Sequence, residues 1–172
     1  MDVLWSPWRY EYIKSGDEPE NQKESRRCVF CDLSNLENGS DEEKFILHRA
    51  RFNFVVLNIY PYISGHLLIV PFAHLADLDA LLPEASNEMM DLAKYSQKFL
   101  RDVYRPNGFN LGMNLGKAAG AGVADHVHLH FMPRWFGDAN FTTTIGETRV
   151  IPEDLSVTYQ KLKPQFDSLP EK

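Results

Sequence analysis

The segment Asp125–Arg134, in which histidine alternates with apolar residues, constrains the fold more than any other part of the chain. It reads Asp-His-Val-His-Leu-His-Phe-Met-Pro-Arg and holds half of the six histidines in the sequence. A repeat of two residues is the period of a β-strand, so the three imidazoles are predicted on one face. Side chains on one face of a strand lie roughly 6.5–7 Å apart. We therefore expect His126, His128 and His130 in a row, each able to act as base, nucleophile or metal ligand.

Length and composition favour one well-buried domain, because the chain has 172 residues of which 44% are hydrophobic. The formal net charge of -6 argues against a protein that coats nucleic acid, although a local basic pocket for phosphates is compatible with it. No segment approaches the roughly 18 apolar residues of a membrane span, and the first ten residues lack the pattern of a signal peptide. We expect a soluble, cytoplasmic protein without a membrane or bulk nucleic-acid partner.

The chain is expected to form one globular unit with three regions. Residues 1–43 form an N-terminal extension, 44–137 the central domain, and 138–172 a C-terminal extension. The aromatic-rich opening, Leu4–Ile13, is expected to dock on the body or on a second subunit, because a disordered tail rarely contains so many aromatics. The polar stretch Lys14–Arg27 is expected to be loop.

Hydrophobic periodicity predicts a mixed α and β domain. The clearest helix spans 84–104, with Pro83 at its entry and Pro106 after its end. Strands are expected at 45–48, 52–58, 66–71 and 109–115, followed by the histidine strand. The order β-β-β-α-β-β indicates an antiparallel sheet of about five strands with one long helix packed on it, an α+β fold. The tail is expected to contain weak strands at 142–145 and 149–151 and a weak helix at 156–166.

The only two cysteines, Cys28 and Cys31, lie close together in Cys-Val-Phe-Cys. With only these two cysteines, so close together, a disulfide-stapled secreted scaffold is not expected, and the spacing favours a redox pair or half of a metal site about equally. A tetrahedral zinc site would need two more ligands.

The run His126–Met132 resembles the histidine-triad motif of the HIT superfamily of nucleotide hydrolases and transferases. Further matches follow in the expected order, so the resemblance covers roughly residues 44–137. Within the superfamily the chain looks most similar to bacterial diadenosine tetraphosphate phosphorylases. These matches are Asn58, Gly65–Pro71, the long helix, Asn114–Gly116 and Pro133–Trp135 for the superfamily, and Leu4–Arg9, Leu57–Tyr62 and Gly137–Phe141 for the subfamily.

The resemblance implies a HIT-like fold and a division of roles among the polar residues. It makes His128 the nucleophile that attacks the α-phosphorus, with its other ring nitrogen held by a carbonyl. His130 and His66 are then the candidates to neutralise charge on the phosphoryl oxygens. Asn58 looks like the residue that holds the ribose hydroxyls, and Asn114 like one that contacts the α-phosphate or orients the substrate.

The small-residue loop Gly116–Gly122 is expected to be flexible and to bring backbone N–H groups close to phosphates. Gly120 and Gly122 are therefore candidate substrate-binding positions, and Lys117 could neutralise a leaving polyphosphate. Many family members place Ser, Thr or Gln just before the triad, whereas this chain has Gly122 and Val123 there. Help for the leaving group must then come from backbone donors, Lys117 or another element.

The resemblance also implies a structural Zn²⁺ ion. In several HIT proteins and in the related galactose-1-phosphate uridylyltransferases, an N-terminal Cys-x-x-Cys binds zinc with two histidines. The matching residues here are Cys28, Cys31, His74 and His126. The first histidine of the triad is thereby expected to be structural.

The function implied is cleavage of dinucleoside polyphosphates such as diadenosine tetraphosphate through a nucleotidyl-His128 intermediate. Inorganic phosphate as acceptor would make the enzyme a phosphorylase, and water would make it a hydrolase; the subfamily likeness favours phosphate. The alternatives are a nucleoside phosphoramidate hydrolase and a nucleotide-binding sensor or interaction module with little turnover. HIT proteins generally pair through the long helix and a sheet edge, so a homodimer is expected.

Overall fold

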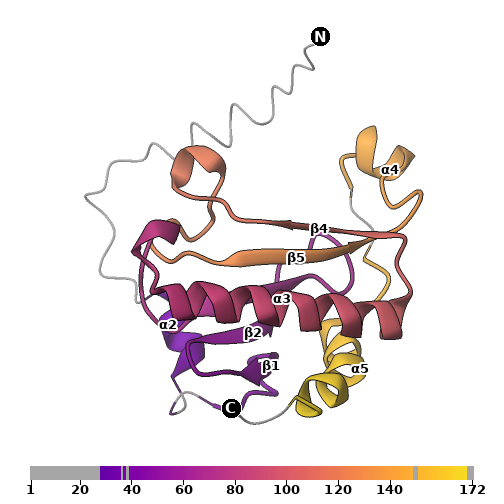
Figure 1. Cartoon of the computed structure of the whole chain (residues 1–172). Coiled ribbons are helices and arrows are strands. Elements are labelled where there is room, and N and C mark those ends of the chain that lie inside the picture. The colour runs from indigo at the N-terminus through magenta and orange to yellow at the C-terminus, as the bar shows by residue number, and fades with distance from the viewer. Residues whose placement is uncertain (1–27, 36, 38, 149–150, 170–172) are drawn as a thin grey trace.

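The protein, seen in a computed structural model that describes residues 28–35, 37, 39–148 and 151–169, contains a five-stranded antiparallel sheet (Figure 1). The order of the strands across the sheet is β1-β2-β3-β5-β4, and every neighbouring pair is antiparallel. The strands are β1 (Ile46–Arg49), β2 (Asn53–Leu57), β3 (Leu67–Pro71), β4 (Gly108–Gly112) and β5 (Leu129–Arg134). The expected α+β fold is confirmed.

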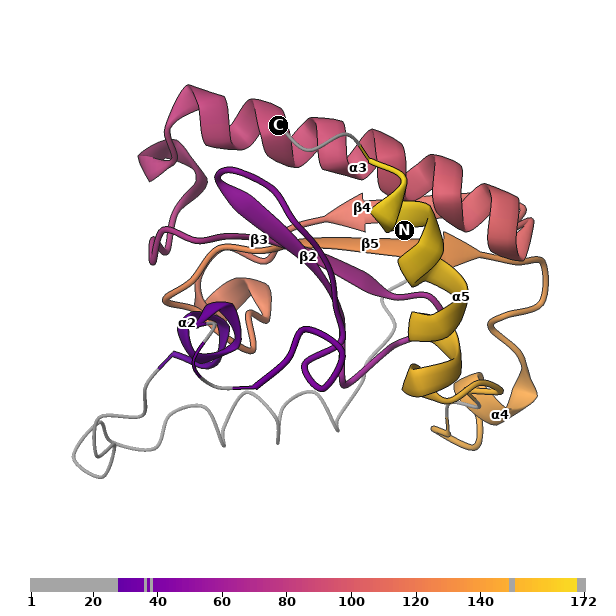
Figure 2. The ribbon, with the colours of Figure 1, turned by 90° about the horizontal axis from the view of Figure 1, so that it is seen from below.

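Helices cover both faces of the sheet (Figure 2). The long helix α3 (Pro83–Tyr104) lies across one face, and α5 (Leu155–Asp167) packs against α3 and β1. The short helix α2 (Val29–Ser34) lies on the opposite side of the sheet from α3. The remaining helical pieces are α4 (Phe141–Thr144) and the single 3₁₀ turns η3 (Leu78–Ala80) and η4 (Lys117–Ala119). None of the described helices has the length and apolar character needed to cross a bilayer.

Burial on both faces explains why β2 and β3 are continuous apolar runs in the sequence. All residues of both strands are buried, and their side chains point alternately into two separate apolar clusters. Val55 and Ile69 lie in the cluster under α3 and α5. Phe54 and Leu68 lie in the smaller cluster that Phe30 of α2 covers. A single sheet thus separates a large core from a small one.

The helix expected at 84–104 is confirmed as α3. Pro83 occupies its first turn, where a missing N–H costs nothing, and the helix ends at Arg105 in the left-handed conformation with φ 48°. Its buried face packs on the sheet and consists of Ala85, Met89, Leu92, Ala93, Ser96, Phe99 and Leu100. The helix expected at 156–166 is confirmed as α5, whose Leu162 and Phe166 are fully buried in the large core.

Two sequence predictions for the tail and for the N-terminal region need correction. The strand predicted at 142–145 is wrong, because Asn140 caps a helix there and accepts the Thr142 N–H at 3.0 Å. Helix α2 was not expected, since six residues are too few to show a helical period. Of the strand predicted at 149–151 only Ile151 is described, and it is not in a strand; Leu4–Ile13 and Lys14–Arg27 lie outside the described residues.

The long helix is tied to the hairpin between β1 and β2 by the Glu88 carboxylate. It accepts the backbone N–H groups of Arg51 at 3.1 Å, Phe52 at 2.8 Å and Asn53 at 2.9 Å. The buried Asn53 amide adds a fourth bond to the same carboxylate at 2.9 Å. One side chain therefore satisfies three consecutive backbone donors in the segment that leads into β2.

Replacing Glu88 with alanine is expected to lower the free energy of unfolding by about 2–3 kcal/mol, because half-buried N–H groups lose a charged acceptor. Glu84→Ala, an exposed position on the same helix, is the matched control and is expected to change stability by under about 0.5 kcal/mol. Urea unfolding followed by circular dichroism measures both. Equal stability of the two variants would show that the Glu88 bonds do not hold the hairpin.

Candidate active site and metal centre

The three histidines of the alternating segment are buried on the face of the sheet that α2 covers. Val127, Leu129 and Phe131 point instead into the large core, so the predicted alternation between two faces is confirmed. The strand itself is shorter than expected, because β5 begins at Leu129 and only His130 of the three lies within it. His126 and His128 belong to the segment that leads into the strand.

His128 is held by a hydrogen bond that fixes its tautomer. Its Nδ1 lies 2.8 Å from the carbonyl oxygen of His126 and must donate to it, because a carbonyl accepts only. The neutral ring therefore carries its proton on Nδ1 and keeps a lone pair on Nε2. Burial lowers the pKa of His128, an effect that the bond to the carbonyl partly opposes. The ring is thus neutral near pH 7, a state in which Nε2 can act as a base, nucleophile or hydrogen-bond acceptor.

His130 and His66 form a pair across the strands β3 and β5. Leu68 pairs with His130 in the sheet register, which places the side chain of His66 diagonally opposite His130 on the same face. The Tyr62 N–H donates to His66 Nδ1 at 3.2 Å, so the proton of neutral His66 lies on Nε2. That nitrogen lies 3.0 Å from His130 Nδ1 and donates to it.

This chain of donors leaves the proton of His130 on Nε2, where it is available for a substrate oxygen. Burial is the main cause that lowers the pKa of His130 to about 4, and the neighbouring His128 adds to it. His130 is therefore a neutral donor near pH 7.

Gly65 allows the chain to turn into this pair. It has φ 76°, a conformation that side chains disfavour, and an added Cβ would lie 3.1 Å from Leu100 and 3.3 Å from Pro133. The next residue, His66, follows directly from this turn. A larger residue at position 65 would therefore disturb the placement of His66 as well as the turn itself.

The two asparagines predicted for the substrate lie on either side of the His66–His130 pair. Asn58 is half-buried, and its Nδ2 lies 3.3 Å from His66 Nδ1. Asn114 lines an open pocket together with His130 and Tyr62. The ring of Tyr62 stacks on that of His130, with centroids 6.0 Å apart and planes at 18°. No sequence pattern singles out Tyr62 as a site residue.

The loop Gly116–Gly122 is exposed. Lys117 lies in the η4 turn, and its side chain makes no hydrogen bond or ion pair with the part of the chain that is described. Gly116 and Gly120 have φ 77° and 86°. The structure therefore does not bring Lys117, Gly120 or Gly122 into contact with the triad, although it places the loop on the same side of the sheet as α2 (Figure 2).

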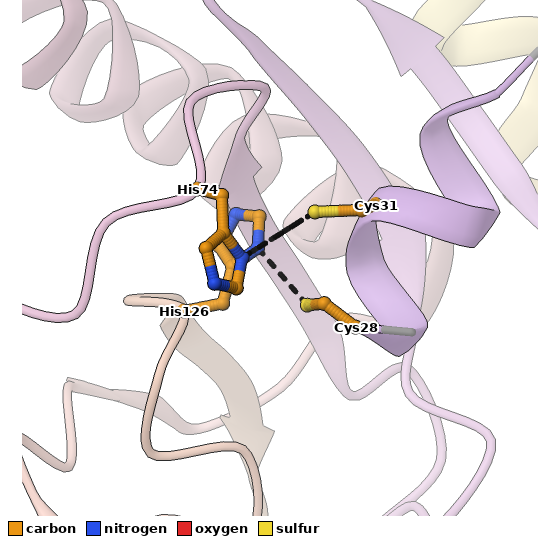
Figure 3. Close-up of side chains that lie close together, drawn as sticks. All are labelled: Cys28, Cys31, His74 and His126. Atoms are coloured by element: carbon orange, nitrogen blue, oxygen red, sulfur yellow. Dashed lines mark hydrogen bonds between the residues drawn. The ribbon is translucent and has the colours of Figure 1, made fainter. Parts of the chain in front are cut away.

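The two cysteines meet His74 and His126, as Figure 3 shows. The cysteines come from α2 and its N-cap, His74 from the loop after β3, and His126 from the segment before β5. Cys28 Sγ lies 3.3 Å from His126 Nδ1, Cys31 Sγ lies 3.4 Å from His74 Nδ1 and 3.7 Å from His126 Nδ1, and the two Nδ1 atoms are 3.3 Å apart. All four candidate ligand atoms lie within 4.8 Å of one another.

These distances fit the edges of a tetrahedron around one metal ion. Zinc bonds of about 2.3 Å to sulfur and 2.0–2.1 Å to nitrogen require sulfur–nitrogen edges of about 3.5 Å and nitrogen–nitrogen edges of about 3.3 Å. His126 also has the required tautomer, because its Nε2 donates to the Pro71 carbonyl at 2.9 Å and leaves a lone pair on Nδ1. The residues present therefore fit a tetrahedral metal such as zinc.

Comparison with known proteins gives three independent matches. The family model of the HIT domain matches residues 40–137. The AP-4-A phosphorylase of Mycobacterium tuberculosis is 38% identical over 172 aligned residues, which cover 99% of this chain and 87% of that protein. The adenosine 5'-monophosphoramidase HNT1 of Saccharomyces cerevisiae is 34% identical over 108 residues, or 62% of each chain.

Solved structures agree with the sequence matches. The crystal structure of a Zn-bound histidine triad family protein from Mycobacterium smegmatis superposes with a TM-score of 0.65 and 28% identity, covering 81% of this chain and 93% of the other. The HIT family model matches more than half of the chain, and one relative is similar along almost the whole length of the chain. The chain therefore belongs to the HIT family.

Proposed function

We propose that this protein is a nucleotidyl-transferring enzyme that cleaves dinucleoside polyphosphates, such as diadenosine tetraphosphate, at the α-phosphorus. The observation that carries the proposal is the fixed tautomer of His128, whose Nδ1–H is held by the His126 carbonyl at 2.8 Å. A neutral imidazole with a free Nε2 is the state that a phosphorus nucleophile needs.

The reaction proceeds in two displacements. In the first, His128 Nε2 bonds to the α-phosphorus as the bond between that phosphorus and the bridging oxygen breaks, and ATP leaves. In the second, an oxygen of inorganic phosphate attacks the nucleotidyl-His128 phosphorus, the P–N bond breaks, and ADP is released. Water in place of phosphate would give AMP. Dividing one difficult cleavage into two steps is the general advantage of covalent catalysis.

His130 and His66 stabilise the negative charge that builds up on the phosphoryl oxygens. His130 donates from Nε2, and His66 keeps that proton in place by donating to Nδ1 at 3.0 Å. Asn58 binds the ribose hydroxyls and Asn114 orients the α-phosphate. This assignment depends on their positions: Asn58 lies beside His66, and Asn114 lines the same pocket as His130.

The loop Gly116–Gly122 contacts the leaving polyphosphate in this scheme. Lys117 is exposed and its ammonium group is available to neutralise the charge of the leaving group, while Gly120 and Gly122 let backbone N–H groups approach it. A flexible arm can serve leaving groups of different length, because it makes no contacts that fix one position.

Phosphate is the proposed acceptor because the 38% identical mycobacterial relative is named an AP-4-A phosphorylase. A second candidate activity is hydrolysis of nucleoside phosphoramidates, which the similarity to the yeast 5'-monophosphoramidase favours. Both reactions use the same attack by His128 and differ in the leaving group, so products distinguish them.

We also propose that Cys28, Cys31, His74 and His126 hold a structural Zn²⁺ ion. Four protein ligands leave no open position for substrate or water, which is typical of structural sites. When bound, the ion would tie α2 to the loop after β3 and to the segment before β5. Burial, the hydrogen bond to Cys28 and repulsion by Cys28 and Asp32 raise the pKa of Cys31, so a cation would be needed to favour its thiolate.

A homodimer that works in the cytoplasm is the proposed context of this chemistry. Strand β4 is an edge of the sheet, and its residues Asn110–Gly112 are exposed, so its free backbone groups can pair with a second copy. Both cysteines are free thiols, which suits a reducing compartment.

Incubation with diadenosine tetraphosphate is expected to give ADP and ATP in equal amounts when inorganic phosphate is present. Without phosphate, turnover is expected to fall at least about tenfold and AMP to replace ADP, because water is then the only acceptor. Chromatography of the nucleotides measures both, and adenosine phosphoramidate is tested in parallel. AMP as the main product in saturating phosphate would identify a hydrolase, and no turnover of any substrate would favour a binding module.

His128→Ala is expected to lower kcat at least about 10³-fold while the nucleotide dissociation constant changes little, since only the nucleophile is removed. His48→Ala, a histidine on β1 away from the cluster, is the matched control and should keep activity. Turnover is measured by nucleotide chromatography and binding by calorimetry. Comparable activity of the His128 variant would remove this residue from the nucleophile role.

Purified protein is expected to contain about one zinc ion per chain, and the Cys28→Ser, Cys31→Ser double variant to contain far less, because both thiolate ligands are lost. Elemental analysis by mass spectrometry measures the metal. Ser34→Ala, on the same helix but outside the cluster, is the control. Equal metal content in the wild type and the double variant would rule out this site.

A further inference from the structure

Phe30 lies in α2, between Cys28 and Cys31 in the sequence. It has no role in the proposed reaction or in the proposed metal site. Its side chain is 5% exposed and covers the small apolar cluster on the catalytic side of the sheet. The other buried members of this cluster, Ile46, Phe54, Val56, Leu68 and Val70, belong to β1, β2 and β3 or lie beside them. Phe30 alone among them comes from the short helix that carries the cysteines.

The ring of Phe30 contacts two histidines of the triad. Its centroid lies 4.8 Å from that of His128, with the planes at 52°, and 5.4 Å from that of His126, edge to face at 77°. The ring of His130 lies 4.9 Å from that of His128 at 64°. Among the described residues, the imidazole of His128 therefore has two ring neighbours within 5 Å, Phe30 and His130.

Three contacts together restrict how the imidazole of His128 can turn. The hydrogen bond from Nδ1 to the His126 carbonyl fixes one end of the ring, but a single bond still allows the ring to tilt about it. The rings of Phe30 and His130, both packed against that of His128, limit this tilt. The direction of Nε2 then depends on all three.

We propose that Phe30 is a positioning residue, whose ring holds the imidazole of His128 in the orientation that points Nε2 at the substrate phosphorus. The inference rests on the proposed role of His128 as nucleophile. Displacing a reacting atom by about 1 Å can cost about a hundredfold in rate, so a purely apolar side chain can control the chemical step. The cysteines on either side of Phe30 point to the metal cluster and thereby set the position of its ring.

Phe30→Leu tests this role, with Phe54→Leu as the matched control. Both residues are buried phenylalanines of the same apolar cluster, but Phe54 stacks on Phe72 and has no ring contact with the triad within the described residues. We expect Phe30→Leu to lower kcat about 10- to 100-fold, with KM, nucleotide dissociation constant and zinc content within about twofold of wild type. Phe54→Leu should lower the melting temperature and leave kcat nearly unchanged.

A second measurement reads the ring directly and does not require turnover. In NMR spectra, the ring of His128 in the wild type is expected to give sharp resonances from one orientation. Phe30→Leu is expected to broaden these resonances by exchange between orientations, while Nδ1 stays protonated because the His126 carbonyl still accepts its proton. Phe30→Met, which keeps more of the side-chain length, serves if the leucine variant does not fold. It is expected to show the same broadening, because a flexible chain does not confine a ring plane.

Two results would overturn the inference. The first is a Phe30→Leu variant with wild-type kcat and His128 ring resonances as sharp as those of the wild type. The second is a rise in KM or in the nucleotide dissociation constant at constant kcat, which would make Phe30 part of the nucleotide-binding surface. If His128→Ala remained active, the proposed function would fail, and the NMR comparison of Phe30→Leu with Phe54→Leu would still decide whether Phe30 holds the ring.

Discussion

The structure of the site depends on His126, whose two ring nitrogens and carbonyl oxygen each contact a different part of the molecule. Its Nε2 donates to the carbonyl of Pro71 at the end of β3, and its Nδ1 faces Cys28, Cys31 and His74. Its carbonyl oxygen accepts the proton of His128 Nδ1. A displacement of this one residue would therefore change the metal cluster and the orientation of the proposed nucleophile together. These bonds give His126 a structural role that does not require contact with a substrate.

The sheet makes this arrangement rigid because both of its faces are covered. Val127 and Leu129 are buried in the large core under α3, so the backbone between the histidines cannot shift without opening that core. Truncating a buried leucine costs about 2–5 kcal/mol, which is comparable with a large part of the stability of a domain. The pairing of Leu68 with His130 adds the register between β3 and β5. Apolar packing on one face thus fixes the geometry of polar groups on the other.

The sequence predicts elements that have a period and misses those that do not. Helix α3 and strands β2 and β3 match the prediction to within two residues at each end, because α3 has a long amphipathic pattern and the strands are continuous apolar runs. Helix α2 is too short to show a period, and α4 depends on the cap at Asn140 more than on its β-branched threonines. Local propensity therefore predicts the wrong secondary structure where a single capping hydrogen bond determines it, as in α4.

For the site, the spacing of the histidines predicts their common face, but their separate partners depend on the tertiary structure. Tyr62 lies only four residues before His66, but the apolar pattern of this segment does not indicate that its N–H donates to the histidine ring. The contact of Phe30 with His128 joins segments far apart in the chain, so the local sequence does not indicate it either. The resemblance to a family supplied the metal ligands, and the structure brings all four together. For the exposed loop Gly116–Gly122, neither the sequence spacing nor the contacts in the structure indicate a role in the site.

The histidines of the site are uncharged, so they can react with a substrate but cannot neutralise the charge of a polyphosphate. His130 has a pKa of about 4 because it is buried, and burial also lowers the pKa of His128, so near neutral pH both rings are uncharged. Neutral rings can carry out nucleophilic attack and donate hydrogen bonds, but they supply no positive charge to a polyphosphate. The chain as a whole is acidic, with a formal net charge of -6. The positive charge must come from a cation bound with the substrate or from mobile groups such as Lys117. In the proposed function, the rigid sheet supplies the reacting groups, and the exposed loop Gly116–Gly122 is the element that can select among leaving groups.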